Sequence, residues 1–510
     1  MLKDSRTAKS LKNSSVALLF YFVNLVLQFY SRKIFLEYLG TEILGLNTTA
    51  TNLLQFLNLA ELGIGTAVGF SLYKPFYDND TQTINEIVAL QGKLYRRIAY
   101  IVLAGAAVLM CFFPLIFAKM TLPLWYAYAS FSVLLFSALL SYFVNYKQIL
   151  LSADQKEYKI QYSYKATNLA KVLVQILVIR YFANGYVWWL ILEAVFAVIA
   201  SIALSITVKR TYPFVRKSSL TFKELNAKYP NIQTKIKQVF IHKIASFALT
   251  QTSPLIIYAF STLTLVAIYG NYMLIVMGLI SLASALSNGL SASVGNLTSE
   301  GHLDKVLAVF EELFSLRFYI TAVMCFGMFM VAQPFITLWI GADYLLPTSS
   351  LTLITVFLFV SISRFTVESF LNAYGYYSDI YAPIVETILN IGLSILLGYY
   401  FGLNGILAGV LISLLLVVLI WKPIFLFKIK LKKGLRQYCV SYVTHLFISA
   451  AIAWLSYIVA NTISLNVKVN LGSLILALTL YVGLYALLLI ISLYLANCGI
   501  RKVLNRFVHK

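Results

Sequence analysis

Residues 186–208 read YVWWLILEAVFAVIASIALSITV, and this stretch decides the fold class. It contains a single charged residue, Glu193. An α-helix rises 1.5 Å per residue, so about 20 apolar residues cross the ~30 Å hydrocarbon core of a membrane. In that core only a helix or a closed barrel satisfies every backbone polar group. The stretch is therefore predicted to be a transmembrane helix.

Similar apolar runs recur along the whole chain, and they predict an all-α integral membrane protein with about fourteen transmembrane helices. Connections as short as Asn184-Gly185 and Asn404-Gly405 must reverse the chain as turns. The predicted spans are 14–38, 43–72, 98–118, 122–150, 164–183, 186–208, 239–260, 264–294, 317–340, 347–373, 380–400, 404–427, 439–460 and 471–497.

Composition supports this class and excludes others. Of 510 residues, 60% are hydrophobic and 12% are charged, and the mean hydropathy is +0.82. Soluble domains carry about 25% charged residues. These values exclude a soluble enzyme, a secreted disulfide scaffold and a disordered chain. The four cysteines form no metal-binding or disulfide pattern.

The net charge of +21 has a topological explanation. An even number of spans places both termini on one side, and Lys and Arg accumulate on the cytoplasmic side. Of the 40 basic residues, 34 belong to the termini and even-numbered loops, three to odd-numbered loops (Lys119, Arg180 and Lys468) and three to spans (Arg32, Lys33 and Arg364). We therefore predict cytoplasmic termini. In this class of protein the positive charge does not indicate nucleic-acid binding.

Sequence matches between the two halves indicate a duplication. Pro114-Leu115-Ile116 returns as Pro334-Phe335-Ile336, and Tyr181-Phe182 returns as Tyr400-Phe401, at offsets of 219 to 224 residues. A repeat of six spans keeps its orientation, so a pseudo-two-fold axis along the membrane normal would relate the two lobes, with a transport site between them. The predicted divisions are an N-lobe (1–210), a cytoplasmic linker (211–238), a C-lobe (239–432) and a C-terminal helical hairpin with a cytoplasmic tail (433–510).

Polar residues within spans are the candidate site, because a charge at mid-bilayer costs roughly 2.5–3.5 kcal/mol and needs a partner or a wet cavity. Arg32 lies about 27 Å along span one, and Glu61 lies near the cytoplasmic end of span two. Arg364 and Glu368 are four residues apart on span ten and can neutralise each other. The alternative for Arg32 is snorkelling to the outer interface.

Three further candidates complete the set. Lys171 lies in the first turns of span five, where solvation at the interface is the alternative. Gln251 and Ser253 precede Pro254 in span seven; they could bind sugar or phosphate, or could satisfy the backbone at the proline. Phosphate loops, metal-ligand spacings and nucleophile elbows are absent from the sequence. We therefore predict no enzyme activity, no cofactor and no metal site.

Several short segments, in this order along essentially the whole chain, resemble bacterial polysaccharide transporters. These are the O-antigen (Wzx-type) flippases of lipid-linked oligosaccharides, within the multidrug/oligosaccharidyl-lipid/polysaccharide exporter superfamily. The segments are Arg32-Lys33-Ile34-Phe35, Leu57-Asn58-Leu59-Ala60-Glu61-Leu62-Gly63-Ile64-Gly65, Ala153-Asp154-Gln155-Lys156-Glu157-Tyr158, Tyr269-Gly270-Asn271-Tyr272, Val294-Gly295-Asn296-Leu297, Leu338-Trp339-Ile340-Gly341 and Pro383-Ile384-Val385-Glu386.

This resemblance implies a bacterial inner-membrane protein that moves an undecaprenyl-pyrophosphate-linked oligosaccharide to the periplasmic leaflet by alternating access. It implies that basic cavity residues, Arg32 above all, bind the pyrophosphate. Related sequences often carry an acid near the position of Ser253, so the coupling cation, H⁺ or Na⁺, stays open beside the membrane potential. Membrane lipids are the other expected partners.

Two rival functions stay open. A cation-coupled multidrug exporter of the same fold should carry acidic residues in its first-lobe cavity, whereas span one offers Arg32 and Lys33. A membrane polymerase or ligase acting on the same glycans should expose a large periplasmic loop, whereas the odd-numbered loops have about ten residues or fewer.

Overall fold

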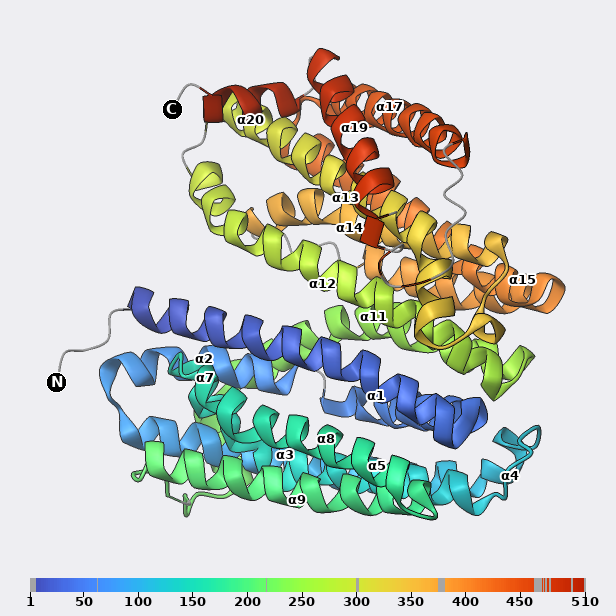
Figure 1. Cartoon of the computed structure of the whole chain (residues 1–510). Helices are drawn as coiled ribbons and strands as arrows, with labels where there is room; N and C mark the ends of the chain where they lie inside the picture. Colours follow the sequence, from blue (N-terminus) through green and yellow to red (C-terminus); the bar gives the residue numbers. More distant parts are fainter. Residues whose placement is uncertain are drawn as a thin grey trace. The chain divides into compact units, whose positions relative to one another are not determined.

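The computed structural model describes residues 6–61, 63–216, 218–299, 302–374, 381–462, 478–496 and 499–508, with 470, 472, 475 and 476. Every described element is helical, which confirms the predicted class (Figure 1). The first helices are α1 (Arg6–Leu57), α2 (Ile64–Asp78), α3 (Thr81–Cys111), α4 (Phe113–Ile116), α5 (Trp125–Phe143), α6 (Ile149–Ala153), α7 (Glu157–Ile160), α8 (Ala166–Tyr181), α9 (Gly185–Thr211), α10 (Phe222–Lys228) and α11 (Pro230–Phe260). The later ones are α12 (Leu263–Ser299), α13 (Leu303–Trp339), α14 (Thr348–Ala373), α15 (Tyr381–Leu414), α16 (Lys422–Phe425), α17 (Leu435–Thr462), α19 (Gly483–Leu495) and α20 (Gly499–Val508).

Ten of the described helical stretches are long and apolar enough to cross a membrane. Two of them are broken by glycines with non-helical backbone angles, Gly40 in α1 and Gly402 in α15. Both breaks fall where the sequence analysis separates one span from the next. α8 and α11 occupy the predicted fifth and seventh spans but are not among the ten. The total of fourteen stays a prediction.

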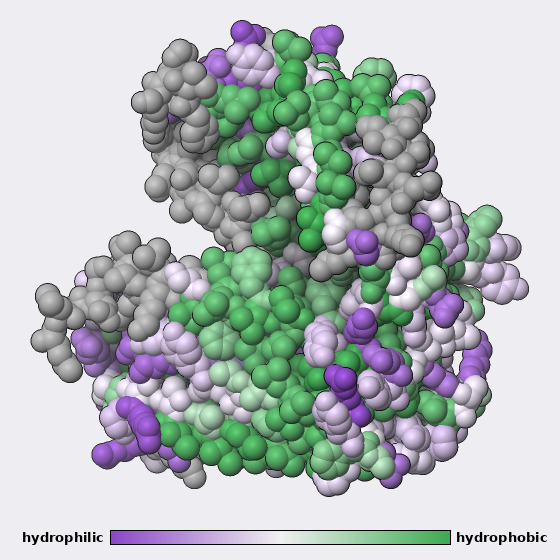
Figure 2. Space-filling view, viewed as in Figure 1, coloured by the Kyte–Doolittle hydropathy of each residue, from purple (hydrophilic) through white to green (hydrophobic). Residues whose placement is uncertain are grey.

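The surface is that of a multi-pass membrane protein. Large apolar side chains such as Val26, Leu115 and Phe447 are mostly exposed. Figure 2 shows hydrophobic residues covering the middle of the helices of the first unit defined below, with hydrophilic residues gathered nearer their ends. A soluble domain rarely exposes an apolar area of this extent, so the exposed side chains fit contact with lipid tails.

The chain forms two compact units, 1–267 and 268–510, and the division falls within α12. In the first unit α1, α5, α8 and α9 pack against one another. Their shared core includes Phe35, Ile176, Ile179 and Leu190. α11 packs on α1 and α2 of this unit. The lobe and linker boundaries predicted from the sequence concern function and stay a prediction.

Loops that carry many of the basic residues meet at one end of the first unit. The Asn13 side chain donates a hydrogen bond to the Gln155 carbonyl at 2.9 Å, near the start of α1. The Lys156 ammonium lies 5.3 Å from the centre of the Tyr212 ring. The amino-terminal segment, the loop before α7 and the loop after α9 therefore lie together, as the predicted topology requires.

The segment after α9 is held against the start of α3. The Asn85 side chain donates to the Phe214 carbonyl at 3.2 Å and accepts from the Arg216 backbone N–H at 3.0 Å. The Glu86 carboxylate accepts a hydrogen bond from the Tyr229 hydroxyl at 2.5 Å. It also pairs with Lys228 at 2.7 Å, and this hydrogen bond raises the pKa of the Lys228 ammonium. The predicted linker is thus a strap with its own contacts.

In the second unit α13 is the central helix. Phe310, Phe314 and Phe318 of α13 form an aromatic core with Tyr438 of α17. The fully buried His445 of α17 joins this core, and its Nε2 lies 2.9 Å from the Ser315 hydroxyl. The two helices are therefore joined by aromatic packing and by one buried polar contact.

His445→Ala is expected to lower the free energy of unfolding by about 3 kcal/mol. The change leaves the buried Ser315 hydroxyl without this partner, which costs about 1–3 kcal/mol, and it also removes packed ring atoms. Thermal or denaturant unfolding of the purified protein in detergent measures the effect. His302→Ala is the control, because His302 is exposed at the start of α13. Equal stability of both variants would contradict a bracing role for His445.

Candidate functional site

The strongest charge cluster within the apolar helices joins α14 to α16. The predicted pair is present: Arg364 Nη2 lies 2.7 Å from Glu368 Oε1, one turn away on α14. The Lys422 ammonium contacts the same oxygen. All three side chains keep between 14% and 27% of their surface exposed, so they lie at an edge rather than in a sealed core. Two cations share one carboxylate, and the cluster carries a net charge of +1.

Lys422 is a residue that the sequence analysis missed. It was counted with the basic residues on the cytoplasmic side after span twelve, and no local pattern links it to Glu368, 54 positions earlier. A signal was nevertheless present, because Lys422 falls within the predicted span 404–427. A cation inside a span needs a partner.

Glu386 of α15 adds an acid to the surroundings of this cluster. Its side chain is 2% exposed, and its Oε1 has no hydrogen-bond partner among the described residues. It lies within electrostatic range of both Arg364 and Lys422. The region therefore holds two cations and two carboxylates, so its net charge depends on whether Glu386 carries a proton.

Arg32 lies on α1 of the first unit, eight residues before the break at Gly40. Its Nη2 donates a hydrogen bond to the Ala267 carbonyl at 3.2 Å, near the start of α12. A carbonyl oxygen stabilises a guanidinium but does not neutralise it. The neighbouring Lys33 is exposed, as expected for a side chain that snorkels.

Glu61 lies at a break within the predicted second span, which the sequence analysis drew as one helix over 43–72. The helix ends at Leu57, a 3₁₀ turn follows (Asn58–Glu61), and Gly63 adopts a positive φ of 102° before α2 begins. Only glycine adopts this backbone conformation easily, which explains the break. The Tyr95 hydroxyl donates to Glu61 Oε1 at 2.8 Å, so the carboxylate is held at the discontinuity.

Lys171 of α8 forms an ion pair across a helical hairpin. Its ammonium lies 2.6 Å from Glu193 Oε1 of α9, and the other carboxylate oxygen accepts from Gln175 at 3.0 Å. The interfacial solvation considered for Lys171 is therefore not what the structure shows. Its charge is balanced within the first unit.

The corresponding hairpin of the second unit contains an uncharged version of this contact. Asn390 and Ser413 lie 219 and 220 residues after Lys171 and Glu193, within the offsets of the repeat or one residue of them. The Asn390 amide donates to the Ser413 hydroxyl at 3.3 Å. The same position therefore joins the two arms of each hairpin, which indicates a structural role for Lys171.

This correspondence predicts that the Lys171→Asn/Glu193→Ser double variant folds within about 1 kcal/mol of wild type. Glu193→Ser alone should cost about 3 kcal/mol, because it leaves a half-buried ammonium without its counter-charge. Unfolding of the purified variants in detergent measures both values. A double variant as unstable as the single one would show that the two hairpins are not equivalent.

The remaining candidates lie on α11. Ser253 is buried, 4% exposed, directly before Pro254. The side chain of Gln251 lies outside the described residues. Within the described part of the chain, no three His, Cys, Asp or Glu side chains gather as metal ligands.

Long apolar helices, exposed apolar faces and charge clusters within the spans define a multi-pass membrane protein with polar sites inside its helical units. No family model and no curated protein sequence matches this chain. Solved structures do match. The lipid II flippase MurJ in an inward closed conformation aligns with a TM-score of 0.68 at 13% identity, over 93% of this chain and 99% of the flippase.

A second solved structure is an inward-facing multidrug resistance transporter of the MATE family, in the MOP superfamily. It aligns with a TM-score of 0.60 at 14% identity, over 84% of this chain and 99% of that transporter. The chain therefore has the fold of MOP-superfamily transporters. Because both identities are low, these likenesses establish the fold alone.

Proposed function

We propose that this protein is a flippase that moves a lipid-linked oligosaccharide, carried on undecaprenyl pyrophosphate, from the cytoplasmic to the periplasmic leaflet. The observation that carries the proposal is the fold shared with a lipid II flippase over 93% of the chain. The cationic side chains within the spans suit an anionic head group. On this proposal the protein is a bacterial inner-membrane transporter with cytoplasmic termini, and it serves export of a surface polysaccharide.

Physical chemistry makes a protein necessary for this step. Each sugar hydroxyl without a hydrogen bond costs several kcal/mol in hydrocarbon, so an oligosaccharide needs a polar path. The polyprenyl tail can stay in the bilayer meanwhile. An inside-negative potential favours outward movement of the pyrophosphate by about 2.3 kcal/mol per charge per 100 mV. The potential, with or without a coupling H⁺ or Na⁺, would supply the driving force.

We assign two basic sites to the anionic head group. One is Arg32 in the first unit, and the other is Arg364 with Lys422 in the second. Glu61, Ser253 and Gln251 are proposed to contact the sugar or a coupling cation. Lys171 is paired with Glu193 and is assigned a structural part instead.

Transport in proteoliposomes tests the assignment of Arg32. Arg32→Ala should slow flipping of a fluorescent polyprenyl-pyrophosphate glycan at least tenfold, since a hydrogen bond to a charged group contributes about 1.5–3 kcal/mol. Arg32→Lys should restore part of the rate. The exposed neighbour supplies the matched control, Lys33→Ala, which should transport at the wild-type rate. Wild-type transport by Arg32→Ala would remove Arg32 from the site.

Gene deletion separates the proposed function from its rivals. A flippase defect leaves the lipid-linked glycan on the cytoplasmic face. Unpolymerised glycan on the outer face would instead indicate a polymerase or ligase. The MATE-like fold keeps a drug exporter as the second candidate. Drug hypersensitivity of the deletion strain, without any change in its glycan, would favour that exporter.

A further inference from the structure

A polar groove lies between α13, α17 and α20 in the second unit. Its lining includes Glu311, Arg436, Gln437, Val440, Thr444 and Lys502. α20 approaches α13 closely at Gly499, where an added Cβ would lie 2.4 Å from the Glu311 carbonyl oxygen. Glycine at this position thus permits a helix contact that forms one edge of the groove.

The charges in this groove sum to +1. The Glu311 carboxylate is already engaged, because Gln437 donates to one oxygen and Lys502 lies 3.5 Å from the other. Arg436 is exposed, and no described residue pairs with it. One negative and two positive side chains leave a single positive charge. A phosphodiester carries a single negative charge and would balance it.

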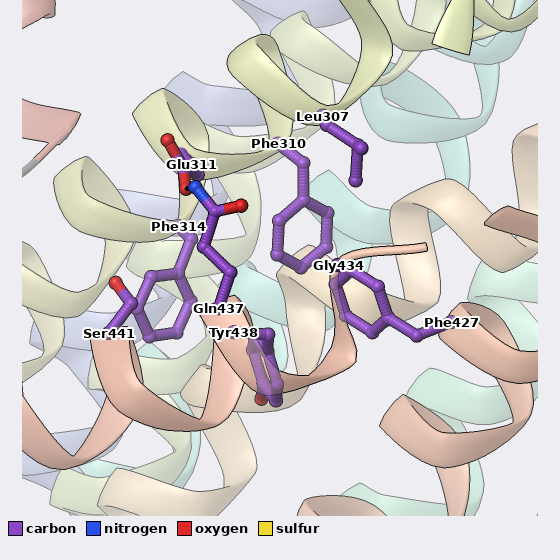
Figure 3. Close-up of a pocket in the computed structure, with 9 residues that line it drawn as sticks. All are labelled: Leu307, Phe310, Glu311, Phe314, Phe427, Gly434, Gln437, Tyr438 and Ser441. Atoms are coloured by element: carbon purple, nitrogen blue, oxygen red, sulfur yellow. Dashed lines mark hydrogen bonds between the residues drawn. The ribbon is translucent and has the colours of Figure 1, made fainter. Parts of the chain in front are cut away.

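The surroundings of the groove are apolar, which distinguishes a lipid from a soluble anion. Figure 3 shows an adjoining hollow in which Gln437 meets Glu311 beside the rings of Phe310, Phe314 and Tyr438. Those rings offer contacts to hydrocarbon and none to a small hydrated ion.

One face of α17 continues from the arginine into an apolar stripe. Val440, Val443 and Phe447 follow Arg436 at spacings of four, seven and eleven residues, so all four share a helix face. The three apolar residues are 59%, 63% and 75% exposed. A cation at one end and exposed apolar side chains beyond it match a molecule with an anionic head and a long tail.

We propose that this groove binds an anionic glycerophospholipid of the surrounding bilayer. The phosphate contacts Arg436 and Lys502, and an acyl chain lies along Val440 and Phe447. The site belongs to the second unit alone and involves none of the residues assigned to the transported substrate. The bound lipid ties α20 to α17.

Binding of phosphatidylglycerol to the purified full-length protein in detergent tests the proposal. Wild type should bind phosphatidylglycerol at least tenfold more tightly than phosphatidylcholine. Arg436→Gln/Lys502→Gln should weaken phosphatidylglycerol binding about thirtyfold, about 2 kcal/mol at 1.4 kcal/mol per factor of ten. The control Lys432→Gln/Lys433→Gln removes the same charge from the adjacent loop and should bind within about twofold of wild type.

Several results would overturn the proposal. Equal binding of both lipids by wild type would exclude an anion site, and equal losses in the two double variants would indicate diffuse attraction. Binding of glycerol 3-phosphate as tight as that of the lipid would indicate a soluble ligand. If the first double variant does not fold, Arg436→Gln alone serves, since Arg436 has no ion pair to lose. Its expected loss is about fivefold, and wild-type affinity would refute the site.

Discussion

The Glu368→Ala variant is expected to lose about 3 kcal/mol of unfolding free energy. In wild type the Glu368 carboxylate is shared by Arg364 and Lys422. Its removal leaves two cations side by side without their counter-charge, and breaking a buried ion pair from one side typically costs about 3–5 kcal/mol. The lower value is expected because the side chains are partly exposed. Thermal or denaturant unfolding in detergent measures the loss.

A neutral version of the cluster separates stability from transport. The Arg364→Met/Glu368→Leu/Lys422→Met triple variant should recover most of the stability, because apolar residues of similar volume often replace a buried ion cluster without cost. If the two cations bind the head group of the substrate, the same variant should transport at least tenfold more slowly than wild type. A triple variant that is stable and transports at the wild-type rate would show that the cluster is structural only.

The second large effect is expected at Gly405, where the arms of the α15 hairpin meet. A Cβ at this position would lie 1.9 Å from the Leu397 carbonyl oxygen, far inside contact distance. The arms would have to separate, so Gly405→Ala should cost about 3 kcal/mol or more and should lower the yield of folded protein.

Two other glycines calibrate this prediction. Gly392 lies on the same helix with nothing within 4 Å of an added Cβ, so Gly392→Ala should be neutral or stabilise by up to about 1 kcal/mol. Gly185, 220 residues before Gly405, meets Ile179 at 3.1 Å, and alanine there should have an intermediate cost. Detergent unfolding ranks the three variants. A Gly405→Ala variant as stable as Gly392→Ala would contradict the close packing of the arms.

Much of the helical framework is predictable from local pattern. Apolar length predicts helices that cross a membrane, and the predicted separations at 39–42 and 401–403 coincide with the breaks at Gly40 and Gly402. The Arg364–Glu368 pair is also predictable, because both residues occupy one face of one helix. These features depend on neighbours within a few turns.

Contacts between distant residues are less accessible from the sequence. Lys422 reaches Glu368 from another helix, and Lys171 reaches Glu193 across a turn. The break before α2 was missed because residues 43–72 are apolar throughout, and apolar length alone does not show that Gly63 has a positive φ. Polar side chains within spans can be recognised in the sequence, but their partners are decided by packing.

The strap along α3 has a consequence for splitting the gene. Cutting the chain inside residues 217–219 and co-expressing the pieces would send α11 away with the carboxyl-terminal fragment, although α11 packs on α1 and α2. The amino-terminal fragment would then be born without one of its own walls, and Asn85 and Glu86 would have to recapture their partners from a separate polypeptide. A break inside α12 would instead interrupt a continuous helix. This architecture therefore favours inheritance as a single reading frame, despite its internal duplication.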